Sequence, residues 1–160
     1  MLFIKIILIL VLFLILVQDY KERKVFWFLY PIVGVLVFVL QFKQNGIEVS
    51  IMNSILNLCF VTLILLVAYI YNLIKLKLKF LKEVFGLGDV LFFVFISFSF
   101  ATVSFITLFV FSLVFSLLLH ELFKKKSQYK SIPLAGYMSL FFGVIYLLSF
   151  VVNISFLYAI

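Results

Sequence analysis

The chain has 160 residues, of which 68% are hydrophobic, 20% aromatic and only 12% charged. A soluble globular domain has about half of its residues apolar and about a quarter charged, so we expect an integral membrane protein with a single domain, residues 1–160. One cysteine, Cys59, and one histidine, His120, exclude an intramolecular disulfide and leave too few ligands for a metal site, and no cofactor is predicted.

The first half of the chain contains three apolar segments that predict membrane-spanning helices. Residues 1–17 lack the small-residue cleavage site of a secretory signal peptide, so we interpret them as a first, short span. Residues 25–41 form the second predicted span. A polar link over residues 42–50 leads to the third span, residues 51–74.

The second half of the chain opens with an uncharged stretch, residues 90–119. One helix of this length would extend about 45 Å, which exceeds the hydrocarbon core of about 30 Å. We therefore expect two spans with a tight turn near residues 97–104, with one overlong, tilted helix as the alternative. The last span is predicted at residues 132–157. The expected fold is all-α, with about six transmembrane helices.

The basic residues predict how these spans are oriented. Loops on one side carry eleven lysines and arginines, and the other side carries only Lys5 and Lys43. Basic residues collect in cytoplasmic loops, and lysines at membrane edges also explain the net charge of +7 without a nucleic-acid partner. We expect a multi-pass protein of the inner (cytoplasmic) membrane, with both termini outside the cytoplasm. The eleven residues are Lys21, Arg23, Lys24, Lys75, Lys77, Lys79, Lys82, Lys124, Lys125, Lys126 and Lys130.

Two aspartates are predicted at the same depth, on the cytoplasmic side. Asp19 follows the first span, and Asp89 begins the fourth, at the end of the sequence Gly-Leu-Gly-Asp. Two neighbouring carboxylates share one proton, so one can act as a general base on water while the other donates a hydrogen bond to the carbonyl under attack. Such a pair would hydrolyse a peptide bond. Gly86 and Gly88 have no Cβ and would let an extended substrate lie against the loop.

Each aspartate also has a structural interpretation. Asp is a common N-cap residue, and Gly-Leu-Gly-Asp before an apolar run is also how an ordinary helix begins. Asp19, close to Lys21 and Arg23, could be a solvated loop residue. A carboxylate that borders a membrane span is nevertheless a candidate functional residue. Both interpretations stay open at this point.

The sequence around both aspartates resembles one family of membrane proteases. Residues 19–25, DYKERKV, resemble the D-x-x-x-R-x-I pattern of the type IV prepilin peptidases and their archaeal preflagellin relatives. Residues 86–89, GLGD, resemble the GxGD motif that carries the second aspartate of these aspartic endopeptidases. Residues 131–136, SIPLAG, are similar to the proline-containing start of the family's final helix. The resemblance covers essentially the whole chain.

The resemblance implies an aspartic membrane endopeptidase in which Asp19 and Asp89 form the catalytic pair. Arg23, Gly86 and Gly88 would bind substrate or support the loops. The substrates would be pilin-like precursors of a pilus or a secretion system, cut after a short basic leader at the cytoplasmic membrane surface. Large bacterial members carry an additional region with paired CxxC motifs and also N-methylate the new terminus. We expect the short, peptidase-only form here, and methyltransferase activity is in doubt.

Two functions of other kinds also fit the sequence. One is a catalytically silent scaffold of the same fold within a pilus or secretion assembly. The other is a small ion or proton transporter that uses Asp19 and Asp89 as ion sites, although a transporter places such groups near mid-bilayer and often contains internal repeats, which this sequence lacks. The sequence predicts neither the substrate nor the oligomeric state, and it does not show whether the two aspartates meet without substrate.

Overall fold

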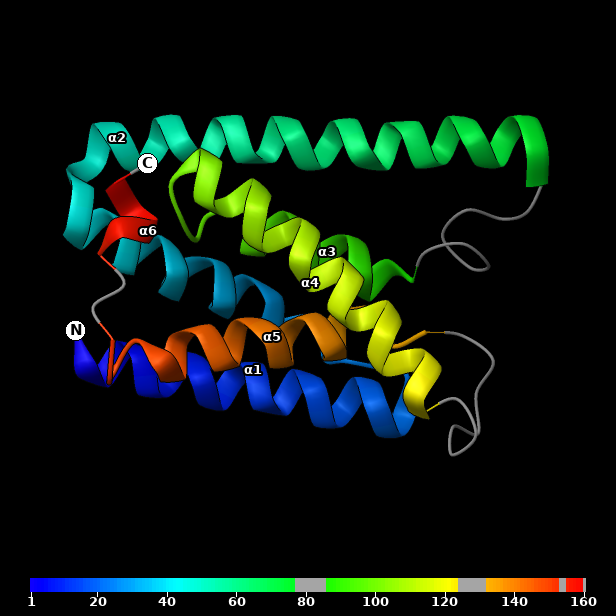
Figure 1. Ribbon diagram of the computed structural model, residues 1–160, viewed down its shortest axis with the longest axis horizontal. Helices are drawn as coiled ribbons and strands as arrows, with labels where there is room; N and C mark the ends of the chain where they lie inside the picture. The colour runs from blue at the N-terminus through cyan, green and yellow to red at the C-terminus, as the bar shows by residue number, and fades with distance from the viewer. Residues whose placement is uncertain (77–85, 124–131, 153–154, 160) are drawn as a thin grey trace.

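The computed structural model describes residues 1–76, 86–123, 132–152 and 155–159, and its regular secondary structure in these ranges is entirely helical. In chain order the helices are α1 (Leu2–Glu22), α2 (Leu29–Tyr71), the π-helical turn η1 (Asn72–Leu76), α3 (Leu87–Ile96), α4 (Thr102–Phe123), α5 (Leu134–Leu148) and α6 (Phe156–Ala159). Helices α1, α5 and the second half of α2 run along the long axis of the molecule, and α4 crosses it obliquely (Figure 1).

Three helices of the described chain are long and apolar enough to cross a membrane: α1, α2 with the turn that follows it, and α4. Helices α3 and α5 are apolar but shorter, with 10 and 15 residues. The prediction of an all-helical chain is confirmed, and the three long helices are consistent with a membrane protein. The lysines that the sequence analysis placed in residues 77–85 and 124–131 lie outside the described residues.

Helix α2 consists of two arms that meet at Gly46. The backbone angles of Gly46, φ 77° and ψ 174°, are not helical, and the second arm folds back over the first (Figure 1). Glycine adopts a positive φ without the steric cost that a Cβ would add. The predicted polar link over residues 42–50 is wrong in its extent, because helix continues on both sides of this single residue.

The chain turns between α3 and α4, within the stretch where the sequence predicts a turn. Asn57, on the second arm of α2, is fully buried, and its Nδ2 donates hydrogen bonds to the carbonyl oxygens of Ser97 and Phe100, each at 2.9 Å. An unpaired backbone carbonyl in an apolar environment is costly, so these bonds stabilise the turn. Asn57 thereby fixes where the chain reverses direction.

Replacing Asn57 by leucine is expected to lower the free energy of unfolding by about 1–3 kcal/mol, because two buried carbonyls lose their donor. Thermal unfolding of the purified protein in detergent measures the change. Thr62→Val is the matched control on the same helix, since the Thr62 hydroxyl bonds to Leu58 of α2 itself. Equal unfolding temperatures for Asn57→Leu and wild type would contradict the stabilising role.

The last predicted span is wrong at its C-terminal end. Helix α5 ends at Leu148, and after a turn the short helix α6 packs against the bundle. The Asn45 amide donates a hydrogen bond to the carbonyl oxygen of Tyr158. The Ala101 N–H donates to the carbonyl oxygen of Leu157 at 3.2 Å. The C-terminal segment therefore covers the end of the bundle at which α2 bends and α3 meets α4 (Figure 1).

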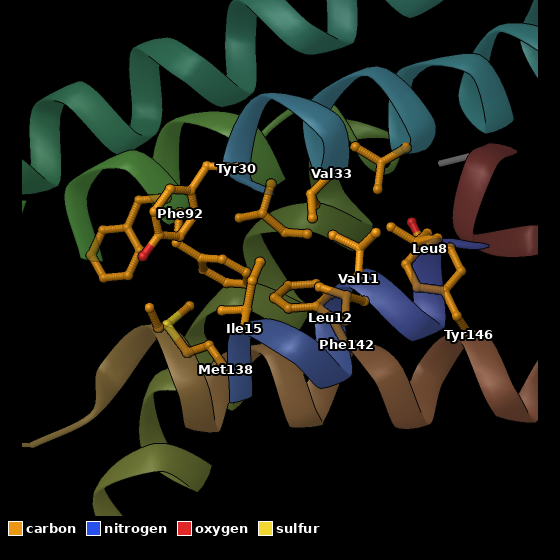
Figure 2. Packing of buried hydrophobic residues seen from close by; sticks show 14 of the residues in the cluster. Leu8, Val11, Leu12, Ile15, Tyr30, Val33, Phe92, Met138, Phe142 and Tyr146 are labelled. Carbon is orange, nitrogen blue, oxygen red and sulfur yellow. The ribbon is translucent and has the colours of Figure 1, made fainter. Parts of the chain in front are cut away.

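The core is built from apolar side chains of α1 to α6, seen close by in Figure 2. On α1 the buried positions follow the helical repeat, at Leu8, Leu12 and Ile15. On α5 they include Met138 and Phe142. This stripe of α1 packs between α2 and α5 and continues towards the end of the bundle opposite to α6.

Candidate active site

Asp19 lies on the buried face of α1, one turn before the helix ends. It follows Ile15 by four residues and Leu12 by seven, so the helical repeat directs its carboxylate into the bundle. Only 9% of its surface is exposed. The structural interpretation of Asp19 as a solvated loop residue is therefore wrong.

Asp89 lies in the first turn of α3 and also extends a buried stripe, formed by Phe92, Phe93 and Ile96. Its Oδ2 accepts a hydrogen bond of 3.2 Å from the N–H of Gly86, the N-cap residue. The N-cap interpretation of Asp89 is thus wrong about the residue, because Gly86 occupies that position. One carboxylate oxygen of Asp89 remains for a second contact.

The first turn of α5 brings the two carboxylates together. Asp19 Oδ2 accepts a hydrogen bond of 2.7 Å from the Gly136 N–H, and Asp89 Oδ1 accepts one of 2.8 Å from the Ala135 N–H. The first N–H groups of a helix have no acceptor within the helix and carry the positive end of its dipole. Because Ala135 and Gly136 are consecutive, two aspartates that are far apart in the sequence occupy neighbouring positions.

The contact between α1 and α5 leaves little room for a Cβ at position 136. A Cβ added at Gly136 would lie 3.0 Å from Asp19 Oδ2 and 3.1 Å from Asp19 Cβ, which is closer than ordinary van der Waals contact. Residues 131–136 were predicted to matter only through the family resemblance. The hydrogen bonds from their backbone N–H groups to the carboxylates were not predicted, because they do not depend on side-chain type.

Arg23 ends α1 in the left-handed conformation, with φ 55° and ψ 22°. Residues with a Cβ seldom adopt this conformation, and here it turns the chain directly after the helix. The Arg23 guanidinium lies within electrostatic range of both Asp19 and Asp89. The positive charge of Arg23 thus lies near the two carboxylates. The family resemblance gave Arg23 as a residue that binds substrate or supports the loops.

A pocket of about 300 Å³ opens beside the aspartates. This volume is at the lower end of the range for ligand-binding pockets. All five residues singled out from the sequence line it: Asp19, Arg23, Gly86, Gly88 and Asp89. The other lining residues, none of which was predicted, are Lys24, Val25, Trp27, Tyr30, Leu87 and Leu91.

Tyr30 is the pocket residue with the closest link to the motifs. It lies in the first turn of α2 and exposes only 1% of its surface. A Cβ added at Gly88 would lie 2.5 Å from the Tyr30 hydroxyl oxygen, so the phenol lies directly against the glycine that precedes Asp89. Its ring meets Phe92 edge-on, with centroids 6.5 Å apart (Figure 2). No local pattern distinguishes it from the other tyrosines of the chain.

Within the described residues, no group of three or more His, Cys, Asp or Glu side chains could hold a metal ion. Comparisons of the chain with protein-family models, with curated proteins and with solved structures found no match.

Proposed function

We propose that this protein is an aspartic endopeptidase of the prepilin peptidase type, with Asp19 and Asp89 as its catalytic pair. The observation that carries the proposal is the binding of the two carboxylates to consecutive N–H groups of α5, those of Gly136 and Ala135. These are the only two aspartates in the chain, and each lies in a motif that resembles this family. The pocket beside them gives a peptide room to approach both.

The pair would hydrolyse the peptide bond in two steps. Neighbouring carboxylates share one proton, because two negative charges side by side repel each other. The ionised carboxylate takes a proton from water as the water oxygen adds to the carbonyl carbon, and the protonated carboxylate gives its proton to the carbonyl oxygen. The newly ionised carboxylate then takes a hydroxyl proton back, the C–N bond breaks, and the other carboxylate protonates the nitrogen. The pair again holds one proton.

The proposed substrates are pilin-like precursors, cut between a short basic leader and a hydrophobic helix. The aspartates lie near the ends of α1 and α3, so the site is at one end of the bundle and not halfway along its helices. In the orientation predicted from the lysines, this end faces the cytoplasm. A cut at the border between leader and helix requires a site at that depth.

The six-span topology is part of the same proposal. The two arms of α2 would be the second and third spans, α3 and α4 the fourth and fifth, and α5 the sixth. Helices α3 and α5 are only about 15 and 22 Å long. Their apolar composition and the reversal of the chain at each turn support this count, and their length does not.

N-terminal sequencing of membrane proteins by mass spectrometry tests the function in cells of the source organism. A strain that lacks the protein is complemented with wild type, with the double variant Asp19→Asn/Asp89→Asn, or with Glu48→Gln. Glu48 is an exposed carboxylate on α2, outside the pocket, and serves as the matched control. We expect wild type and Glu48→Gln to remove the leaders of a few pilin-like proteins, and the double variant to leave them attached.

If all strains have the same N-termini while each variant is present in the membrane, the peptidase proposal is wrong. The scaffold and transporter functions would then be the next to test.

A further inference from the structure

We propose that Tyr30 is a third catalytic residue, whose hydroxyl donates a hydrogen bond to the carbonyl oxygen of the peptide bond under attack. The inference rests on the proposed function, since it assigns a role within the same reaction. It is carried by the position of the hydroxyl in the pocket and by its lack of a hydrogen-bond partner.

Three observations describe the position of the Tyr30 hydroxyl. The first turn of α2 places the phenol in the wall of the pocket that Asp19 and Asp89 also line. The hydroxyl lies within electrostatic range of both carboxylates. It contacts Gly88 so closely that a Cβ there would lie only 2.5 Å from its oxygen. This explains the second glycine of the GLGD sequence, because any larger residue would displace the hydroxyl from the pair.

The hydroxyl of Tyr30 is buried and, within the described part of the chain, has no hydrogen-bond partner. A buried phenol usually forms such a bond, and leaving it unmade is destabilising. The hydrogen bonds found for the Asp19 and Asp89 carboxylates come from backbone N–H groups and not from this phenol. For packing alone a phenylalanine would serve equally well beside Phe92. The hydroxyl is thus an unused donor in the wall of the pocket, and a substrate that displaces the side chains covering it would supply the missing acceptor.

A second donor to the carbonyl oxygen, beside the protonated carboxylate, would assist the reaction. When the water oxygen adds to the carbonyl carbon, the electron pair of the C=O double bond moves to the carbonyl oxygen, which takes the proton of the protonated carboxylate. The Tyr30 hydroxyl would donate a hydrogen bond to the same oxygen and keep its own proton. This bond becomes stronger as charge develops on the oxygen, so it stabilises the transition state more than the bound substrate.

The test compares Tyr30→Phe with wild type as purified full-length protein in lipid nanodiscs. The substrate is a synthetic peptide with a basic leader followed by an apolar helix. We expect kcat to fall about 10-fold, less than for the loss of a donor to a free oxyanion because the carbonyl oxygen also receives the proton of the carboxylate, and we expect KM to change little. The unfolding temperature should stay the same or rise, because an unpaired buried hydroxyl is removed.

Tyr146→Phe is the matched control. Tyr146 is also fully buried, but its ring stacks on Phe100 near α6, at the other end of the bundle. We expect this variant to keep the kcat of wild type. A Tyr30→Phe protein that retains full kcat, or that loses activity together with a lower unfolding temperature, would overturn the catalytic role while cleavage by wild type still supports the peptidase. No cleavage by wild type would overturn both proposals.

Discussion

Asp19→Asn and Asp89→Asn are each expected to lower kcat for leader cleavage on the order of 10⁴-fold. An amide neither takes a proton from water nor gives one to the carbonyl oxygen, so either change interrupts the transfer of protons within the pair. Single-turnover cleavage by the purified protein measures the loss. Glu48→Gln, which removes an exposed carboxylate of α2, should cleave like wild type.

The two variants should differ in stability. The side-chain oxygen of an asparagine at position 19 still accepts the hydrogen bond from Gly136. At position 89 both carboxylate oxygens are acceptors, from Ala135 and from Gly86, and an asparagine would turn its NH₂ group towards one of these N–H groups. Asp89→Asn should therefore lower the free energy of unfolding by about 1–3 kcal/mol and Asp19→Asn by less. An Asp19→Asn protein that cleaves at a tenth of the wild-type rate would contradict the two-aspartate mechanism.

Gly136→Ala is expected to reduce kcat by about 10-fold although it changes no ionisable group. The added methyl group would lie 3.0 Å from Asp19 Oδ2, so either the carboxylate or the start of α5 has to shift slightly. Such a shift moves a general base away from its best alignment with the attacking water. The same cleavage assay measures the effect.

The matched control for this change lies on the same helix. A Cβ added at Gly143 meets nothing within 4 Å, so Gly143→Ala should leave kcat unchanged and stabilise the helix by up to about 1 kcal/mol. If Gly136→Ala also cleaves like wild type, the contact between α5 and Asp19 is not needed for activity.

The residues that line the candidate site were named from the sequence more completely than the bounds of the helices that hold them. Asp19 and Asp89 were predicted at one depth because each borders an apolar span and the lysines predict the side on which each span ends. Their inward direction was not predicted, and in the structure it follows the helical repeat of buried positions such as Ile15 and Phe92. Depth and direction together bring both carboxylates to one pocket.

Three features of the fold could not be predicted from side-chain patterns: the hydrogen bonds from α5, the end of α5 and the bend at Gly46. The bonds from Ala135 and Gly136 use backbone N–H groups, which every residue except proline has. The end of α5 at Leu148 was missed because the residues after it are as apolar as the helix itself. At Gly46 the error had the opposite cause, since polar neighbours indicated a loop where one glycine is enough to reverse the helix.

The dependence of the aspartate pair on α5 also determines when the pair can form during synthesis. The ribosome completes α1 and α3 before it reaches Gly136, so a chain that ends at α4 carries both aspartates but lacks the N–H groups that hold them together. The two carboxylates are therefore held together only after α5 has entered the bundle. On the proposed function, the chain would cleave no substrate until its own insertion is complete.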